Sequence, residues 1–359
     1  MNEFDQYIRQ GEPSQQERAA YWRTAIGLQA VDGLQTSDYL KATALKHIEG
    51  EIDIDQARQL IRNYYQSKAT RETIDDDQQE ADKASANITK ILSSVSLDFS
   101  ANGFVSLHRR IFEGVLKHAG EIRRYDITKK EWVLDADTVN YLNWEDLYRA
   151  LEFDIEQERQ FSYKNLSLEQ QVLHIAQFVS GLWQIHPFGE GNTRTTAVFT
   201  ILYLRHIGFS VNNDLFATNS WYFRNALVRA NYKNALKGID YSPVYLERFF
   251  RNLLMGEQWD LRNRYLHISP APEWQVQPQL GSEEGVTTTE KTTEKTTEKS
   301  AESIILREMR SNPYVTQKQL AIKCGLTEDG VYYVVSKLRR SGVVKRVGGR
   351  KLGHWEVLG

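Results

Sequence analysis

The chain contains very little cysteine and no long apolar run. Cys324 is the only cysteine among its 359 residues, which excludes an internal disulfide framework and a thiolate metal site. No apolar stretch approaches the length of a membrane span, and the segment Met1–Tyr7 is polar and acidic, unlike a secretion signal. We therefore expect a cytoplasmic protein that does not associate with membranes.

Net charge is also small over the whole chain, but it is unevenly distributed. The chain carries −2 overall, whereas residues 301–359 alone carry +6, which leaves −8 for the rest. A hydrophobic content of 41% and a charged content of 26% are ordinary for a globular protein, and the length allows two or three domains. Because such an asymmetry concerns partners and not fold, we expect the basic tail to contact a polyanion.

A buried helix is predicted to end at a histidine. Ser167 and Gln170 have the spacing of a capping box, which marks the start of this helix. Apolar residues then recur on one face and place His186 at the last turn, and Pro187 ends the helix because it cannot continue one. A lone histidine at a helix end is often only a capping or core residue, but the residues that follow it indicate a catalytic base.

The loop after this histidine combines an acid, two glycines and the start of another helix. The glycines flank the acid and let the backbone turn tightly and approach a ligand. The next helix is expected to point its unpaired amides and positive dipole end at the loop, with an arginine in its first turn. Any turn between helices could hold these residues singly, but together they favour phosphate chemistry. The residues concerned are Gly189, Glu190, Gly191, Asn192, Thr193 and Arg194.

This stretch resembles the signature of the Fic family, His-Pro-Phe-x-Asp/Glu-Gly-Asn-Gly-Arg-x-x-Arg. Two positions depart from it: Thr193 stands where the family usually has glycine, and Ala197 stands where it usually has a second arginine. The matching residues are His186, Pro187, Phe188, Glu190, Gly191, Asn192 and Arg194.

The resemblance implies a fold and an activity. The fold is mainly α, with a Fic-type helical core and a small β-hairpin flap. The activity is protein adenylyltransfer, in which AMP moves from ATP to a serine, threonine or tyrosine hydroxyl of a target protein or of the enzyme itself. His186 would take the hydroxyl proton, and Glu190 would hold Mg²⁺. Nucleotide and phosphate contacts would come from Gly189, Gly191, Asn192, Thr193 and Arg194, with Tyr222 and Asn225 at the nucleoside.

Two further segments gain a role from the resemblance. Residues 122–134 contain two short β-prone pieces that predict the flap, and a target protein is expected to dock around Lys129–Trp132 by strand addition. An exposed hairpin that only closes a loop is the alternative. Glu49, in an Ile-Glu-Gly turn, resembles the inhibitory glutamate of many Fic proteins and would pair with Arg194. Leu45 occupies the position where that motif has a hydroxyl residue, so the restraint should be weak.

The order of the segments predicts four regions: a helical region over 1–100 that carries the inhibitory-like motif, a catalytic core over 101–265, a flexible linker over 266–300 and a domain over 301–359. The linker contains the tetrad Thr-Thr-Glu-Lys three times and cannot offset its ordering entropy. The last region has the pattern of a winged helix (α+β), which binds either DNA or protein. Its candidate DNA contacts are Arg339, Arg340, Lys345, Arg346, Arg350 and Lys351.

Two other functions are compatible with these patterns. The departures at Thr193 and Ala197 would suit a nucleotide-sensing, DNA-binding regulator whose catalysis is weakened or lost. A Fic enzyme that transfers another phosphate-containing group is the second. Self-association into a homo-oligomer is left open by the sequence.

Overall fold

The structure is a computed structural model, and it divides into two units, Met1–Ser282 and Glu283–Gly359, which we describe separately. In the described part of the chain, no helix is long and apolar enough to cross a membrane. The described residues are 4–68, 75–94, 96–211, 214–269, 305–310, 313, 315–324, 331, 334–335, 338–339, 343–347 and 354–358.

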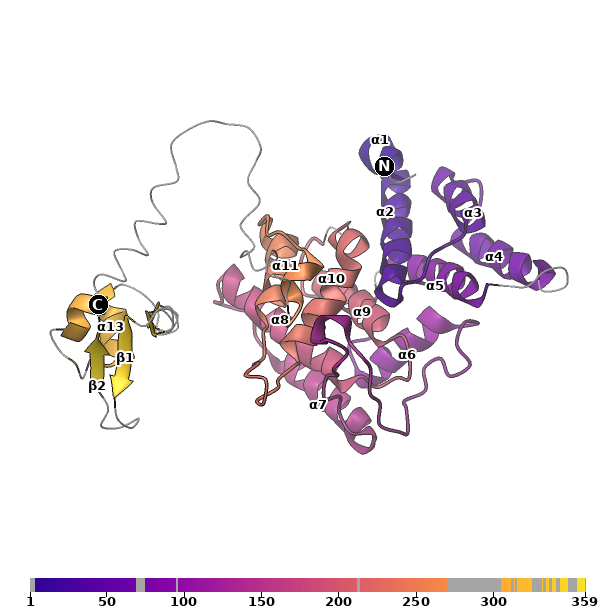
Figure 1. Ribbon diagram of the computed structural model, residues 1–359. Coiled ribbons are helices and arrows are strands. Elements are labelled where there is room, and N and C mark those ends of the chain that lie inside the picture. The colour runs from indigo at the N-terminus through magenta and orange to yellow at the C-terminus, as the bar shows by residue number, and fades with distance from the viewer. Residues whose placement is uncertain are drawn as a thin grey trace. The chain divides into compact units, whose positions relative to one another are not determined.

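The first unit begins with a group of helices around a small core of its own (Figure 1). Serine and glycine set the limits of one of them: the Ser37 hydroxyl accepts a hydrogen bond from the first turn, and Gly50 closes the end with a φ of 82°. The elements are α1 (Asp5–Gln10), α2 (Pro13–Gly27), the 3₁₀ helix η1 (Leu28–Asp32), α3 (Asp38–Glu49), α4 (Ile54–Lys68) and α5 (Asp76–Leu92).

The remaining helices of this unit surround α9, which is buried at every residue from 192 to 204. The mainly helical fold predicted from the sequence is confirmed, including the capping box of Ser167 and Gln170 at the start of α8. The elements are α6 (Ala101–Phe112), η2 (Trp132–Leu134), η3 (Trp144–Asp146), α7 (Leu147–Gln160), α8 (Leu168–Ile185), α9 (Asn192–His206), α10 (Asp214–Ala230), α11 (Val244–Met255) and η4 (Asn263–Leu266).

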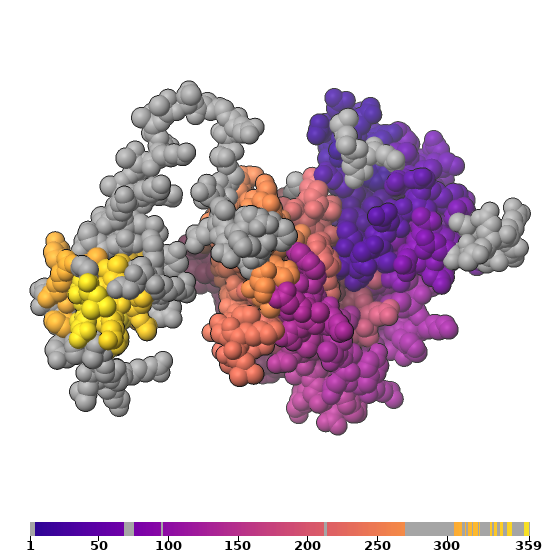
Figure 2. Space-filling model, viewed as in Figure 1, coloured from indigo at the N-terminus to yellow at the C-terminus, as the bar shows by residue number. Residues whose placement is uncertain are grey.

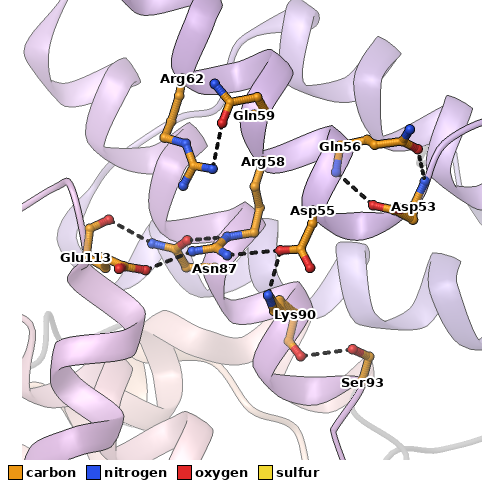
Figure 3. Close-up of polar contacts among 10 residues, drawn as sticks. All are labelled: Asp53, Asp55, Gln56, Arg58, Gln59, Arg62, Asn87, Lys90, Ser93 and Glu113. Carbon is orange, nitrogen blue, oxygen red and sulfur yellow. Dashed lines mark hydrogen bonds and ion pairs between the residues drawn. The ribbon is translucent and has the colours of Figure 1, made fainter.

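The N-terminal helices pack directly on this core. Helix α2 contacts α5 and α10, and η1 contacts α9, so both groups share one continuous surface (Figure 2). Polar side chains add a second connection (Figure 3): Arg58 of α4 donates to Asn87 of α5 at 2.9 Å and pairs with Glu113, just after α6, at 2.9 Å. Lys90 of α5 pairs with Asp55 at 2.5 Å. This packing brings η1 and α5 next to the start of α9.

The predicted β-hairpin over 122–134 is not formed. In residues 128–139, which we call the reverse loop, the chain turns through η2 instead, and the N–H of Glu131 donates to the carbonyl of Asp137 at 2.9 Å. Val133 and Leu134 are adjacent and both fully buried, which a 3₁₀ turn allows and a strand, with alternating faces, does not. The side chain of Trp132, the residue directly before them, remains 45% exposed.

The second unit has its own apolar core. Residues 305–310 are helical, α13 spans Gln317–Cys324, and Thr316 with Gln319 forms a cap at its start. Strands β1 (Val344–Val347) and β2 (His354–Val357) pair antiparallel, with Val344 opposite Val357. The segment 327–340 lies partly outside the described residues. Those described within it are helical: 331, 334–335 and 338–339.

Candidate active site

The candidate catalytic histidine has a defined orientation at the end of α8. His186 caps the helix in the left-handed conformation, with a φ of 49°, and is 2% exposed. Its Nδ1 lies 3.2 Å from the carbonyl oxygen of Trp183, and its ring packs against that of Tyr141 with 4.2 Å between centroids. Because a carbonyl only accepts, Nδ1 carries the proton and Nε2 keeps its lone pair. Burial, and then the charge of Lys129, lowers the pKa of His186 well below its ordinary value, so the imidazole is neutral.

The loop after α8 is closed on itself by an asparagine. The side chain of Asn192 accepts from the N–H of Phe188 at 2.9 Å and donates to its carbonyl at 2.7 Å. The ring of Phe188 stacks on His108 at 3.7 Å, and His108 donates through Nε2 to the carbonyl of Glu190 at 3.1 Å. The N–H of Gly120 donates to the other ring nitrogen at 2.8 Å. The side chain of Asn192 is therefore occupied by hydrogen bonds within the loop. Only the backbone N–H of Asn192 remains to bind a phosphate.

The start of α9 has the geometry of an anion site. Gly191 precedes the helix with a φ of 73°, and a Cβ there would lie 2.3 Å from the ring of Phe112, so only glycine fits. The N–H of Thr195 is the first to find a helical acceptor, the carbonyl of Gly191 at 3.0 Å. The amides of residues 192–194 precede it and have no such acceptor, and they lie at the positive end of the helix dipole.

The structure shows what surrounds the two residues that depart from the Fic signature, Thr193 and Ala197. The hydroxyl of Thr193 accepts a hydrogen bond from the indole N–H of Trp183 at 2.9 Å, and Thr193 is 6% exposed. The side chain therefore satisfies a buried donor, which glycine at this position could not do. Ala197 is fully buried and contributes no charge to the site.

Arg194 is paired with carboxylates of the N-terminal helices. Its Nη2 lies 2.6 Å from Glu80 of α5, and its Nε lies 2.7 Å from Asp32 of η1, an ion pair without the alignment of a hydrogen bond. Its Nη1 donates to Gln29 at 3.0 Å, and the guanidinium lies over the ring of Phe112 at 4.7 Å. With Arg194 only 2% exposed, its guanidinium is fully occupied in this conformation.

The predicted pair between Glu49 and Arg194 is not formed. Glu49 is the exposed last residue of α3, where it accepts hydrogen bonds from the hydroxyl of Tyr7 and from the side-chain amide of Gln15, the latter at 3.0 Å. Gly50 then turns the chain in the left-handed conformation. The carboxylates that reach Arg194 come from η1 and α5, so the inhibitory-like turn is not the element that contacts the signature.

Glu190 is the candidate metal ligand, and it is exposed on the catalytic loop. Magnesium in nucleotide sites is commonly held by one or two carboxylates together with phosphate oxygens and water, so a single exposed carboxylate fits this ion. The described residues contain no group of three or more His, Cys, Asp or Glu side chains that could hold a metal ion by itself. A bound Mg²⁺ would therefore take its other ligands from the substrate and from water.

Tyr222 and Asn225, predicted at the nucleoside, lie inside the fold. Tyr222 is 1% exposed and its hydroxyl donates to the carbonyl of Tyr245 at 3.2 Å. Asn225 is fully buried and its side-chain N–H donates to Asn263 at 2.7 Å. In this conformation neither side chain is open to a nucleoside, and their predicted roles are not supported by the arrangement.

A buried arginine that no sequence pattern identified fixes the loop between α8 and α9. The side chain of Arg123 has no exposed surface, and its Nε donates to the carbonyl of His186 at 2.8 Å. Its Nη1 donates to the carbonyl of Tyr125 at 2.6 Å, and its Nη2 donates to the carbonyl of Leu142 at 2.5 Å. The backbone N–H of Arg123 donates to the carbonyl of Pro187 at 2.9 Å. It lies in a pair of arginines, and nothing in the local sequence shows which of them is buried.

A second group of residues that the sequence did not reveal connects the reverse loop to the catalytic histidine. Glu131 is fully buried, lies 2.8 Å from Arg224 of α10, and accepts a hydrogen bond from the hydroxyl of Tyr141 at 3.2 Å. The ring of Tyr141 in turn packs on His186. The reverse loop, α10 and His186 are therefore held in one polar and aromatic cluster.

A cleft of about 1020 Å³ opens beside the catalytic loop. Gly189 and Glu190 form part of its wall, and the exposed aromatic residues Tyr125, Trp144 and Tyr148 form another part. Partly exposed aromatic side chains next to a reactive loop are typical of a surface that receives a protein segment.

The candidate DNA contacts of the tail are only partly within the described residues. Arg339 and Lys345 are exposed, and Arg346 lies over the ring of Trp355 at 4.7 Å. Arg340, Arg350 and Lys351 lie outside the described residues.

Comparison with known protein families identifies two domains in this chain. The model of the Fic/DOC family matches residues 98–204, and a model described as winged helix-turn-helix DNA-binding matches residues 304–345. The chain thus carries a Fic/DOC family domain and a C-terminal winged helix-turn-helix domain, which confirms the resemblance seen in the sequence. Proteins of the Fic family are typically nucleotidyl or phosphoryl transferases. No curated protein matches the chain.

Several solved structures show a distant likeness. The N-terminal Fic domain of a Bartonella effector protein from Bartonella sp. AR 15-3 is 20% identical, with a TM-score of 0.38 over 49% of this chain and 81% of that chain. The BepC protein of Bartonella tribocorum, with bound AMPPNP, is 17% identical, with a TM-score of 0.36 over 46% and 80%. A Fic family protein of Desulfovibrio desulfuricans is 10% identical, with a TM-score of 0.39 over 97% of each chain.

Proposed function

We propose that this chain is a protein adenylyltransferase, which moves AMP from ATP to a serine, threonine or tyrosine hydroxyl of a target protein or of itself. The observation that carries the proposal is a neutral His186 with Nε2 unprotonated, joined by the short loop 187–191 to the unpaired amides at the start of α9. A base next to an anion site is the arrangement that phosphoryl and nucleotidyl transfer need. The Fic/DOC domain match over 98–204 supports the same class of reaction.

In this reaction the residues of the chain bind, orient and move one proton. The target hydroxyl oxygen forms a bond to the α-phosphorus of ATP, and its proton passes to Nε2 of His186, which contributes roughly 10²–10⁴-fold to the rate. The bond from the α-phosphorus to the bridging oxygen breaks, and pyrophosphate leaves with the electron pair. The amides of 192–194 stabilise the phosphate charge, and Gly189 and Gly191 let the phosphates approach the backbone. When bound at Glu190, Mg²⁺ supplies positive charge to the phosphate oxygens.

Arg194 can serve the leaving pyrophosphate only after it exchanges partners. In this structure its guanidinium is held by Asp32 and Glu80, at 2.7 and 2.6 Å. A nucleotide that binds at the start of α9 would compete with these two carboxylates for the same guanidinium. We therefore propose that η1 and α5, and not Glu49, restrain nucleotide binding.

The target protein is proposed to dock beside the reverse loop. Trp132 at its tip is 45% exposed, and Lys130 is exposed beside it. Because the segment is a 3₁₀ turn and not a strand, we expect side-chain contacts with the target more than a regular strand addition. The cleft lined by Tyr125, Trp144 and Tyr148 offers further aromatic surface for the same partner.

Replacement of the catalytic histidine tests the proposed activity. His186→Ala should abolish transfer of label from α-labelled ATP to protein while nucleotide binding and the melting temperature stay near those of the wild type. His206→Ala is the matched control, because His206 is exposed at the far end of α9 and does not line the cleft. Undiminished labelling in His186→Ala would show that another group is the base.

A second candidate function is that of a nucleotide-sensing regulator that binds DNA. The occupied Arg194 and the winged helix-turn-helix domain favour it. A third is transfer of a different phosphate-containing group by the same site. Mass spectrometry of the chain and of cell proteins after incubation with several nucleotides separates the three, because each predicts a different mass added to protein, or none.

The DNA contact is tested on the full chain. The double variant Arg339→Ala/Lys345→Ala should weaken binding to duplex DNA, and wild-type binding should fall steeply as salt is raised, because phosphate contacts release counterions. Arg149→Ala is the control, since Arg149 is exposed on the first unit. Absence of DNA binding by the wild type at low salt would assign the winged helix to protein contacts.

A further inference from the structure

The signature helix α9 offers no free cation to the terminal phosphates of a nucleotide. Arg194 is ion-paired with Asp32 and Glu80 and is 2% exposed. Ala197, where the Fic signature has its second arginine, is uncharged and fully buried. A polyphosphate is bound in proteins through lysine, arginine, backbone amides and metal ions, so a side-chain cation at this site must come from another element.

Three cations lie close enough to His186 for their charge to lower its pKa, and Lys129 has the largest effect of the three. Arg123 is not available, because its guanidinium donates to three carbonyl oxygens and its side chain has no exposed surface. Arg224 pairs with the buried Glu131 at 2.8 Å. The ammonium of Lys129 makes no hydrogen bond or ion pair with any residue in the described part of the chain.

Lys129 lies where four elements meet. The charged groups that act on its ammonium are Asp32 of η1, Glu131 of the same loop, Glu190 of the catalytic loop and Arg224 of α10. Two of these carboxylates already have closer partners: Asp32 pairs with the arginine of α9 at 2.7 Å, and Glu131 pairs with Arg224. Glu190 is the candidate ligand of Mg²⁺. Of the three cations near His186, Lys129 is therefore the one whose ammonium has no partner in the described part of the chain, and it lies near Glu190 as well.

The segment that carries this lysine is fixed relative to the catalytic histidine. The backbone N–H of Lys129 donates to the hydroxyl of Thr138 at 3.3 Å. Two residues on, Glu131 is held by the hydroxyl of Tyr141, whose ring packs on His186 at 4.2 Å between centroids. The lysine side chain is half-buried, whereas that of its neighbour Lys130 is exposed, so the two point into different surroundings.

We propose that Lys129 binds the terminal phosphates of the nucleotide, in place of the arginine that is absent at position 197. This inference rests on the proposed adenylyl transfer. A lysine ammonium is a compact charge with three donors, which suits phosphate oxygens that approach from different directions. During transfer, its charge stabilises the oxygen of the leaving pyrophosphate as the bond to the α-phosphorus breaks. In this arrangement Lys129 contacts the nucleotide, and Trp132 of the same loop contacts the target protein.

Calorimetric binding of ATP and AMP to the full chain tests the assignment. Lys129→Met should weaken ATP binding by at least about tenfold but AMP binding by less than about twofold, because AMP lacks the phosphates that the lysine contacts. Lys129→Arg should recover most of the loss. Lys130→Met is the matched control and should leave both affinities unchanged. A purely structural role of Lys129 would lower ATP and AMP affinities together.

The outcomes separate this assignment from the proposed function. If Lys129→Met binds ATP as the wild type does, the lysine assignment is wrong while adenylyl transfer stands. If the wild type binds ATP with the expected dependence on Lys129 but transfers no AMP to protein, the proposed function is wrong and the phosphate contact stands. If the wild type binds neither nucleotide, both are overturned.

Discussion

Glu80 is one of two carboxylates of the N-terminal helices that pair with Arg194, and its replacement tests the proposed restraint on nucleotide binding. Its carboxylate lies 2.6 Å from Arg194, whose guanidinium also meets Asp32. Glu80→Gln keeps the size of the side chain and removes its charge. We expect the variant to release part of the hold on Arg194, so that the guanidinium can turn towards a bound phosphate.

The size of the effect follows from the exposure of the pair. The Arg194 side chain is 2% exposed but that of Glu80 is 24% exposed, so the pair is partly screened by water. Ion pairs of this kind contribute about 1 kcal/mol, which corresponds to roughly fivefold in a binding constant. Asp32 remains as a partner, so Arg194 is not left as an unpaired buried charge. We therefore expect ATP affinity and self-modification to rise by about fivefold, with only a small loss of stability.

The assay is a titration of the full chain with ATP together with a time course of self-labelling. Glu49→Gln is the matched control: Glu49 also belongs to the N-terminal helices, but its partners are Tyr7 and Gln15 and not Arg194. It should change neither quantity by more than about twofold. If Glu49→Gln raises labelling and Glu80→Gln does not, the inhibitory-like turn controls the site and the pairing described for Arg194 has no regulatory role.

Two further predictions concern Arg123, which holds the loop between α8 and α9, and the buried His108. Arg123→Lys should lower transfer by tenfold or more with little change in ATP affinity, because a compact ammonium cannot reach the three separate carbonyl oxygens that the guanidinium contacts. Arg149→Lys, at an exposed position outside the cleft, is the control. Burial lowers the pKa of His108 from 6.5 to about 4. The folded state therefore excludes a proton that the unfolded chain binds, so this contribution to stability is complete above pH 6.5 and is lost as the pH falls towards 4. Between pH 7 and pH 5 it amounts to about 2 kcal/mol, and urea unfolding of His108→Gln should show a correspondingly weaker pH dependence than the wild type.

The local patterns of the sequence predicted the framework of the site well. Ser167 and Gln170 form the expected capping box, α8 ends before Pro187 as expected, and α9 begins at Asn192. Each of these depends on residues within a few positions of one another, where backbone geometry and hydrogen bonding follow from residue type. The winged helix-turn-helix at the C-terminus was predictable for the same reason, and the domain match over 304–345 confirms it.

What the sequence could not predict is which distant groups meet. Arg194 was expected to face phosphate, but it pairs with Glu80, 114 positions earlier in the chain, and only the packing of α5 on α9 brings the two together. The β-prone piece over residues 131–134 predicts a strand, yet its adjacent residues Val133 and Leu134 are both buried, which requires a tighter turn. Likewise, burial of Tyr222 depends on packing around α10 that no local pattern shows.

The complete burial of α9 from residue 192 to residue 204 has a consequence for how the site can move. A helix surrounded by close-packed side chains cannot shift without opening contacts on every side, so its hydrogen-bonded amides, from Thr195 onwards, should exchange only when the first unit unfolds globally. Any opening that admits a nucleotide must therefore arise in the elements around it. The N-terminal helices, which hold Arg194 through Asp32 and Glu80, are therefore the elements that we expect to move when a nucleotide binds, while the start of α9 stays in place.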